Sequence, residues 1–298
     1  MDTDESASES PDESADAFAA LSDPTRVEIL RALWDAEDHE ATFSDLREEI
    51  GMRDSGQFNY HLGKLTGQFV RQTDDGTYEL RLAGIQVIGS LLAGTYTGEA
   101  EIGPIPGEES CPDCGIEIMF EYDGDGFTFE CESCETGTLV RMPAPRGVFE
   151  PYEEAETPGV AQRYARNVVR EVTDGFCPFC RGPMTTVVDA GVPGEDPDDT
   201  DDPLPLVRFR CDRCEEPLQT ELGTPLHDHP AVVAFYHDHG EDVFDLPTTR
   251  LLATDTDTAW LDSEEPFRAT VRYRADGDTL DVTIDDSLDV IETARTDR

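Results

Sequence analysis

The sequence predicts an α+β multidomain protein, in which a helical N-terminal domain precedes two small cysteine-bearing β domains and a C-terminal β-hairpin region. Three observations support this prediction. Apolar residues recur at helical spacing up to about residue 97, four Cys-x-x-Cys pairs follow residue 110, and alternating strand-like runs lie near the C-terminus. A chain of 298 residues is long enough for two or three domains.

All eight cysteines belong to Cys-x-x-Cys pairs, and the pairs form two sets. The first set has sixteen residues between its pairs and the second has thirty: Cys111, Cys114, Cys131 and Cys134, then Cys177, Cys180, Cys211 and Cys214. Two intervening residues let both thiolates of a pair reach one tetrahedral Zn²⁺, and two pairs close the site. Disulfides are the alternative, but residues 1–13 lack the apolar run of a signal peptide, and reduced cysteines at this spacing favour metal. We expect two structural Zn ions per chain, each held by a four-cysteine zinc ribbon.

The charge balance is strongly acidic, with 67 Asp and Glu residues against 22 Lys and Arg residues and a net charge of −45. Such a composition is typical of disorder, but these acidic residues lie in segments that also carry apolar residues at core-forming periods. Molar salt shortens the screening length to about 3 Å, which makes the repulsion tolerable. We therefore predict a cytoplasmic protein of a halophilic archaeon, with an acidic protein of ordinary cells as the alternative. No apolar run of about 20 residues is present, so no membrane contact is expected.

The sequence of the N-terminal part predicts a leader followed by a helical domain. Residues 1–14 are expected to be a disordered acidic leader, and residues 15–97 the domain. A helix starts at Asp23-Pro24, a short one capped by Ser44 ends at Gly51, and a longer one runs from residue 54 or 55 to 69. A hairpin then turns at Asp74-Asp75-Gly76, and a largely apolar helix covers residues 82–96.

The remaining boundaries follow from Gly and Pro content and from strand-like alternation. We expect a linker at 98–110, the first ribbon at 111–141, a second linker at 142–158, and a last region at 159–298. That last region is predicted to contain a helix, the second ribbon and further elements: 159–173, 177–222 with an acidic loop at 191–203, a helix at 230–239, and a hairpin from 267–273 and 280–284.

The longer helix has a face suited to DNA. Phe58, Leu62, Leu65 and Phe69 share one side and are expected to point inward. The opposite side carries Gln57, Tyr60 and Lys64, the only lysine of the chain, with Asn59 at its flank. Gln and Asn pair with adenine, and Lys reaches guanine or phosphate. A short helix, a tight turn and a longer helix have the order of a helix-turn-helix, whose second helix enters the major groove.

Three segments also carry a family resemblance: Ala20-Leu-Ser-Asp-Pro-Thr-Arg-Val-Glu-Ile-Leu-Arg31, Phe43-Ser-Asp-Leu-Arg-Glu-Glu-Ile50 and Asn59-Tyr-His-Leu-Gly-Lys-Leu65. With them, residues 15–97 resemble the winged helix-turn-helix domain of ArsR-like transcriptional regulators. The resemblance implies a DNA-binding homodimer whose hairpin is a wing and whose last helix, 82–96, pairs with its mate. It also implies DNA contacts by Ser55, Gln57, Asn59, Tyr60, Lys64 and Arg71. No cysteine precedes Cys111, so the arsenic-sensing thiolate pair of some members is absent.

Two features complicate this interpretation. Residues 16–97 hold 14 acidic and 7 basic residues, a net charge of −7, whereas a DNA-binding domain normally has a basic footprint. Because counterion release loses its force in molar salt, we expect weak, sequence-selective binding that survives high KCl. The apolar 82–96 helix would be covered by a second copy, or alternatively by the ribbons of its own chain.

Other constellations receive structural interpretations. The four histidines between residues 227 and 239 could hold a catalytic metal, and the protein would then be an enzyme. Helix capping and packing explain these histidines better. We therefore assign no catalytic residue. An arginine stripe, Arg163, Arg166 and Arg170, is expected to pair with the chain's own carboxylates, with nucleic acid or an acidic partner as the alternative. A second set, Arg268, Arg272 and Arg274, is expected to pair with Asp281 and Asp285 of the facing strand. The alternative to a regulator is a basal-transcription adaptor resembling archaeal transcription factor E, which would contact RNA polymerase.

Overall fold

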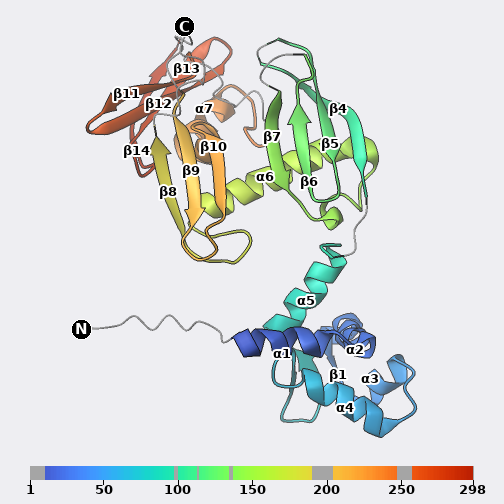
Figure 1. Cartoon of the computed structure of the whole chain (residues 1–298). Helices are drawn as coiled ribbons and strands as arrows, with labels where there is room; N and C mark the ends of the chain where they lie inside the picture. Colours follow the sequence, from blue (N-terminus) through green and yellow to red (C-terminus); the bar gives the residue numbers. More distant parts are fainter. Residues whose placement is uncertain are drawn as a thin grey trace, which may run out of the picture. The chain divides into compact units, whose positions relative to one another are not determined.

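The computed structural model describes residues 11–96, 100–112, 114–133, 137–189, 204–246 and 257–297. It is a mixed α/β structure with seven α-helices and four β-sheets in these residues. The chain divides into two compact units (Figure 1): residues 1–99 with 145–147, and residues 100–144 with 148–298. None of the described helices combines the length and the apolar character that crossing a lipid bilayer requires.

The N-terminal unit contains five helices and a small antiparallel sheet of order β1-β3-β2. Its elements are α1 (Pro11–Leu21), α2 (Pro24–Asp35), the 3-10 turn η1 (Glu37–His39), β1 (Glu40–Ala41), α3 (Phe43–Glu49), α4 (Ser55–Leu65), β2 (Val70–Gln72), β3 (Tyr78–Leu80) and α5 (Leu82–Leu92). The buried face of α2 supplies Ile29, Leu30 and Leu33 to a core that also takes residues from α3, α4 and α5. The expected helices and hairpin are therefore present, in the expected order.

The observed ends of these helices agree with the predicted ends in some cases and differ in others. The Asp23 side chain accepts a hydrogen bond from the Thr25 N–H and caps α2, as Asp23-Pro24 predicts. The prediction that Ser44 caps α3 was wrong, because the Asp45 N–H donates to the Thr42 hydroxyl. Similarly, α4 ends at Leu65 and not at residue 69, and α1 includes the last residues of the expected disordered leader. The rest of that leader, residues 1–10, lies outside the described residues.

The first sheet of the C-terminal unit has the order β4-β5-β6-β7. Its strands are β4 (Ile102–Ser110), β5 (Glu117–Tyr122), β6 (Gly126–Glu130) and β7 (Thr138–Pro143). The linker expected at 98–110 is thus corrected, because most of it is an edge strand paired with β5. Beyond β7 come two 3-10 turns and a long helix: η2 (Arg146–Val148), η3 (Glu154–Glu156) and α6 (Thr157–Thr173). Aromatic residues of the sheet, including Phe120 and Phe127, form one core with Val160 and Ala161 of α6.

The rest of this unit is a second sheet of order β10-β9-β8 and a third of order β11-β12-β13-β14. The elements are β8 (Met184–Asp189), β9 (Leu206–Cys211), β10 (Pro217–Glu221), η4 (Thr224–Leu226), α7 (Pro230–Asp238), β11 (Ala259–Glu264), β12 (Phe267–Ala275), β13 (Asp278–Ile284) and β14 (Val290–Thr296). The predicted C-terminal hairpin is β12–β13, and β11 and β14 extend it to four strands. The acidic loop expected at 191–203 lies outside the described residues.

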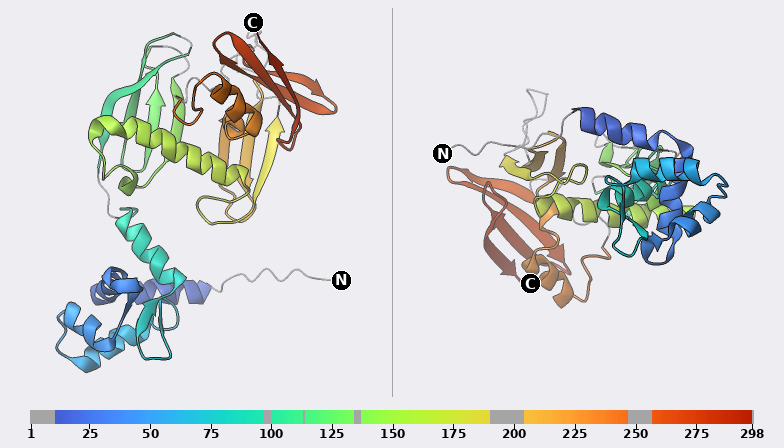
Figure 2. Two further views of the ribbon diagram at one scale, coloured as in Figure 1. Left: turned by 180° about the vertical axis from the view of Figure 1, so that it is seen from behind. Right: turned by 90° about the horizontal axis from the view of Figure 1, so that it is seen from below.

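One helix connects the two halves of the C-terminal unit. Seen from behind (Figure 2, left), α6 runs along both the β4–β7 sheet and the β8–β10 sheet. Val160 and Val169 of α6 pack into the core of the first sheet, whereas Val172, near its C-terminal end, packs with the second and third sheets. The amphipathic pattern predicted for residues 159–173 therefore serves two cores.

Candidate metal centres and candidate nucleic-acid interface

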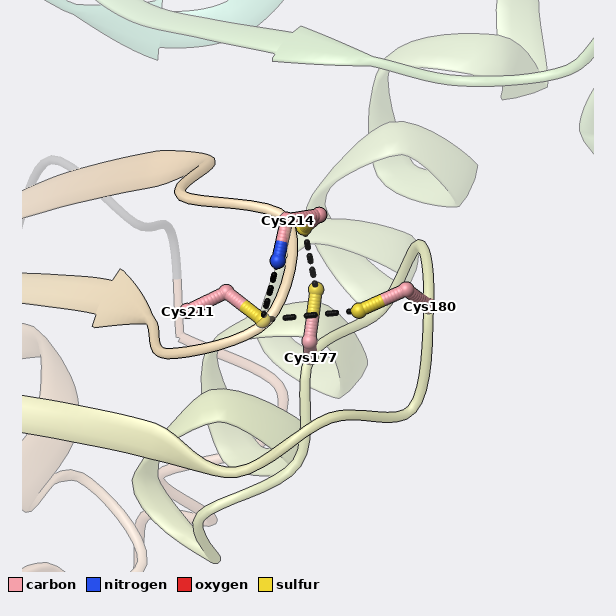
Figure 3. A group of neighbouring side chains, drawn as sticks. All are labelled: Cys177, Cys180, Cys211 and Cys214. Carbon is pink, nitrogen blue, oxygen red and sulfur yellow. Dashed lines mark hydrogen bonds between the residues drawn. The ribbon is translucent and has the colours of Figure 1, made fainter. Parts of the chain in front are cut away.

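The second cysteine set forms a compact group of four sulfurs, here called cysteine site 2 (Figure 3). Cys177 and Cys180 lie in the turn between α6 and β8, Cys211 ends β9, and Cys214 lies in the turn before β10. The Sγ atoms of Cys177 and Cys214 are 3.7 Å apart, and those of Cys180 and Cys211 are 3.4 Å apart. All four lie within 4.8 Å of one another.

These distances can be compared with the geometry that a metal would require. Four sulfurs at about 2.3 Å around one Zn²⁺ lie about 3.8 Å from each other in a regular tetrahedron. The measured 3.4–3.7 Å approaches that value and is far from the roughly 2.05 Å of a disulfide. Site 2 is therefore placed to bind a metal ion, and its donor set is compatible with zinc.

The turns that present the cysteines share one backbone geometry. The N–H of Cys177 donates to the Gly182 carbonyl and that of Cys211 to the Glu216 carbonyl, and the N–H four residues after each cysteine returns to its carbonyl. The residue at this fourth position is left-handed, with φ of 58° at Arg181 and 63° at Glu215. This tight turn brings both sulfurs of a pair to the same side.

The same turn prepares a thiolate. The backbone N–H of Cys214 and then that of Arg213 donate to the Cys211 sulfur, each at 3.4 Å. These donors lower the pKa of Cys211 to about 6, which favours its thiolate form. A thiolate is the form of cysteine that binds metal. The cysteine side chain is also buried, which limits competition by water for the sulfur.

The first cysteine set, cysteine site 1, repeats this arrangement in its described part. The sulfurs of Cys111, Cys114 and Cys131 lie within 4.8 Å of one another, and Cys114 and Cys131 are 3.4 Å apart. Its first turn has the same hydrogen bonds, with Gly115 left-handed at φ 72°. The fourth predicted ligand, Cys134, lies outside the described residues. The three sulfurs suffice to identify a second candidate metal centre.

Helix α4 presents two different faces. Phe58, Leu62 and Leu65 are buried, as their spacing predicts, and so is Phe69 after the helix. The sequence did not identify His61 as a member of this buried side, although its position one turn after Phe58 gave the signal; its Nδ1 lies 3.6 Å from an Asp23 carboxylate oxygen. The residues expected at DNA are exposed: Ser55, Gln57, Asn59, Tyr60 and Lys64 on α4, and Arg71 on β2.

The electrostatics of this exposed face are mixed. The Asp54 carboxylate caps α4 by accepting from the N–H groups of Gly56 and Gln57. On the hairpin, the Arg71 guanidinium pairs with Glu79, which raises the pKa of Arg71. Lys64 extends over the Tyr60 ring, with its Nζ 5.8 Å from the ring centre. Asp54 and Lys64 balance in charge, and Lys64 is the cation among these groups that has no carboxylate partner in the described residues.

The apolar helix α5 is only partly covered within its unit. Gly84 and Ile88 are buried against the rest of the unit. Leu82 and Leu92 remain 69% and 52% exposed, and Ile85 is also exposed. These three large aliphatic side chains form an exposed apolar surface on one short helix.

The histidine-rich segment has structural roles in the described residues. The His229 ring accepts from the Ala231 N–H and caps α7, and His227 is buried. His239 lies 2.7 Å from the Phe235 carbonyl through Nδ1 and 3.1 Å from an Asp278 carboxylate oxygen through Nε2. These contacts agree with the capping and packing that we expected.

Two arginines of the C-terminal unit pair with carboxylates of the same unit. On α6, the Arg170 Nε lies 3.7 Å from an Asp228 carboxylate oxygen and 4.0 Å from one of Asp174. Arg272 makes two hydrogen bonds with Asp281 across β12 and β13, at 2.6 and 2.7 Å. Pairing with the chain's own carboxylates is thus confirmed for Arg170 and Arg272, whereas Arg166 donates to the Phe244 carbonyl and Arg274 to the Asp257 carbonyl.

Comparison with protein-family models gave one match in each unit. A model described as "Domain of unknown function (DUF7351)" matches residues 108–290, more than half of the chain. The chain belongs to the DUF7351 family. Its DUF7351 part includes both cysteine sites, α6 and most of the third sheet, while a second model, "Domain of unknown function (DUF7347)", matches residues 14–91. Neither curated proteins nor solved structures gave a match to this DUF7351 member.

Proposed function

We propose that the protein is a sequence-specific DNA-binding transcriptional regulator, in which residues 15–97 act as a winged helix-turn-helix domain on double-stranded DNA. One observation carries the proposal. Helix α4 buries its apolar side in the N-terminal core and leaves Gln57, Tyr60 and Lys64 exposed on one face, with Asn59 exposed at the flank. Amide side chains on such a helix form bidentate hydrogen bonds with adenine in the major groove.

The neighbouring elements support this role for α4. The short helix α3 precedes it, and the turn between them includes Gly51 in a left-handed conformation, φ 66°. The β2–β3 hairpin follows and would act as the wing, with Arg71 on its first strand. A Cβ added at Gly63 would meet no atom within 4 Å, so nothing crowds that part of the helix surface as DNA approaches.

A dimer is the natural form of such a regulator. We propose that α5 pairs with its copy through Leu82, Ile85 and Leu92, since these exposed side chains would be buried by a second α5. Two recognition helices would then read half-sites about one DNA turn, or roughly 34 Å, apart. An operator with approximate two-fold symmetry is the expected target.

The metal centres have a structural role in this proposal. We propose that sites 1 and 2 each hold one Zn ion through four cysteine thiolates, which leaves no open coordination position for catalysis. Metal binding would hold together the small sheets that carry the sites. The net charge of −45 suits a protein that works in molar salt inside a cell, where specificity rests on direct hydrogen bonds more than on phosphate neutralisation.

Selection of genomic DNA fragments by the full-length protein in molar KCl tests the proposal. Enrichment of a short, approximately symmetric sequence is expected, and the Gln57→Ala/Lys64→Ala double variant should lose it. Arg31→Ala, which removes an exposed charge from α2 of the same unit, should retain it and serves as the matched control. Failure to enrich any sequence, or equal enrichment by the double variant, would refute the proposed function.

A second candidate function is that of a transcription adaptor that contacts RNA polymerase. It is favoured by two aromatic side chains beside cysteine site 2, because Phe176 and Phe179 are 57% and 58% exposed. Exposed aromatic residues are enriched at protein interfaces. Recovery of polymerase subunits with the tagged protein, lost in a Phe176→Ala variant, would favour the adaptor over the operator-binding regulator.

A further inference from the structure

The C-terminal unit contains a cavity of about 300 Å³. It is lined by β7, α6, β10 and the residues around η4. Strands β7 and β10 are edge strands of two different sheets, and α6 runs along both sheets (Figure 2). Its volume lies at the lower end of the range for small-molecule binding sites. This size suits a compact ligand of one or two rings.

Most of the cavity wall is apolar. Met142 of β7, Ala165 and Val169 of α6, and Leu218 of β10 contribute carbon surface from three sides. Pro225 of η4 adds to this surface and is itself buried. An apolar wall with a few polar groups is typical of sites for small organic molecules.

Among the buried side-chain oxygens of the residues that line this wall, two have no hydrogen-bond partner in the described part of the chain. They are the Thr220 hydroxyl oxygen and one carboxylate oxygen, Oδ1, of Asp228, and both are shielded from solvent. The other Asp228 oxygen lies 3.7 Å from the Arg170 Nε and is thereby partly compensated. A polar atom that is shielded from water and lacks a hydrogen-bond partner is unfavourable by a free energy that corresponds to about tenfold or more in a binding constant. A ligand that donates a hydrogen bond to this atom removes that cost and therefore binds more tightly.

The charges around the cavity balance, in contrast to those of the whole chain. Three arginines and three acidic residues line it: Arg141, Arg166, Arg170, Glu216, Glu221 and Asp228. Arg166 is already engaged, because its guanidinium donates to the Phe244 carbonyl and lies over the Phe244 ring. Because the positive and negative charges in the wall are equal in number, the wall does not favour a ligand with net charge. The Asp228 oxygen without a partner favours a ligand with a hydrogen-bond donor.

We propose that this cavity binds an uncharged small molecule with an apolar, ring-sized body and an N–H or O–H group that donates to Asp228 or Thr220. The site lies entirely within the C-terminal unit. It therefore goes beyond the proposed DNA binding and does not depend on it.

Indole is a suitable probe, because it is uncharged, flat and apolar and carries one N–H donor. Isothermal titration of the full-length, zinc-loaded protein in molar KCl should give one bound indole per chain. 1-Methylindole keeps the ring and lacks the donor, so it should bind on the order of tenfold more weakly. Indole-3-acetate and tryptamine, which add a negative or a positive charge, should bind no better than indole.

Variants locate the binding. Thr220→Val removes the hydroxyl at nearly constant volume and Asp228→Ala removes the acceptor, so each should weaken indole binding several-fold. Ala165→Trp should abolish it by filling the cavity. Thr186→Val, on β8 of the same sheet but away from the cavity, should bind indole as the unaltered protein does.

The unaltered protein alone can overturn the proposal. No heat with indole, or equal affinities for indole and 1-methylindole, would do so whatever the variants show. Unchanged indole binding by an Ala165→Trp protein that keeps its zinc and its circular dichroism spectrum would also overturn it, because the ligand would then bind elsewhere.

Discussion

The salt dependence of DNA binding can be predicted from the exposed cations around α4. Lys64 on α4 and Arg53 in the turn before it are exposed, whereas Arg71 is paired with Glu79 and brings no net charge. A dimer that uses Lys64 alone would neutralise two phosphates, and one that also uses Arg53 would neutralise four. Each neutralised phosphate contributes about −0.9 to the slope of log K against log salt concentration, so the slope should lie between about −1.8 and −3.6.

Two substitutions should shift this slope in opposite directions. Lys64→Gln removes two cations from the dimer and should flatten the slope by about 1.8. Glu79→Gln releases the Arg71 guanidinium from its ion pair and should steepen the slope by a similar amount. Gln57→Ala, in contrast, should lower affinity by about 1–3 kcal/mol per lost base contact and leave the slope unchanged.

Fluorescence anisotropy with a labelled duplex of the selected sequence, titrated at several KCl concentrations, measures these slopes. A slope of about −6 or steeper for the unaltered protein would mean that many more phosphates are contacted than the exposed cations allow. Identical slopes for Lys64→Gln, Glu79→Gln and the unaltered protein would mean that α4 and the hairpin do not face the DNA. Either result refutes the reasoning.

Three further outcomes are expected. Cys211→Ser should reduce bound zinc from two ions per chain to one by plasma mass spectrometry, whereas Phe179→Ala, in a cysteine turn of the same site, should keep both; two ions in Cys211→Ser would contradict a four-thiolate site. The α7 carbonyl and the Asp278 carboxylate raise the pKa of His239, so its stabilising contribution is complete below the unfolded value of about 6.5 and is lost as pH rises through the folded value. The free energy of unfolding, measured with urea, should therefore fall above about pH 6.5, and Asp278→Asn should weaken this fall; identical pH profiles would exclude the assignment. Phe58→Ala should cost about 3–5 kcal/mol, because its side chain is fully buried, and a loss below about 1 kcal/mol would mean that α4 does not pack as described.

Signals that act over a few residues predicted the structure well. The period of apolar residues placed Phe58, Leu62 and Leu65 on the buried side of α4, and it gave the amphipathic helix α6 within two residues of its start. The Cys-x-x-Cys spacing brought sulfurs together because the turn that follows each of three described pairs closes through its own backbone hydrogen bonds. Such features need no knowledge of distant parts of the chain.

Strands at sheet edges were harder to predict. Strand β4 contains Gly103, Pro104, Pro106 and Gly107, which read as a linker, yet an edge strand tolerates proline because its outer N–H groups need no partner. Gly107 has a specific reason to lack a side chain, since an added Cβ would lie 3.0 Å from the Ile118 carbonyl oxygen and 3.2 Å from the Phe129 ring. The long-range pairing, and not the local composition, makes this segment a strand.

The last strand shows the same limitation in another form. Most of β14 is exposed, so it lacks the alternation of apolar and polar residues that marks a half-buried strand. It belongs to the third sheet because its backbone pairs with β13, from Thr279 opposite Thr296 onward. The cavity could not be predicted from the sequence either. Its wall combines β7 and α6 with β10, which comes more than forty residues later in the chain.

The proximity of cysteine site 2 to the cavity leads to a final prediction. Phe179 lies between Cys177 and Cys180 and lines the cavity, and Glu216 to Leu218, which follow Cys214, form part of its wall. Loss of the metal frees these turns, and the apparent affinity for a ligand falls by the fraction of molecules that still hold the binding conformation. If that fraction drops to about one tenth, Cys211→Ser should bind indole roughly tenfold more weakly, while Lys64→Gln, altered in the other unit, should bind it normally. Titration calorimetry on the two variants measures these affinities. Normal indole affinity in a Cys211→Ser protein that has lost one zinc would show that ligand binding in the cavity does not depend on the metal.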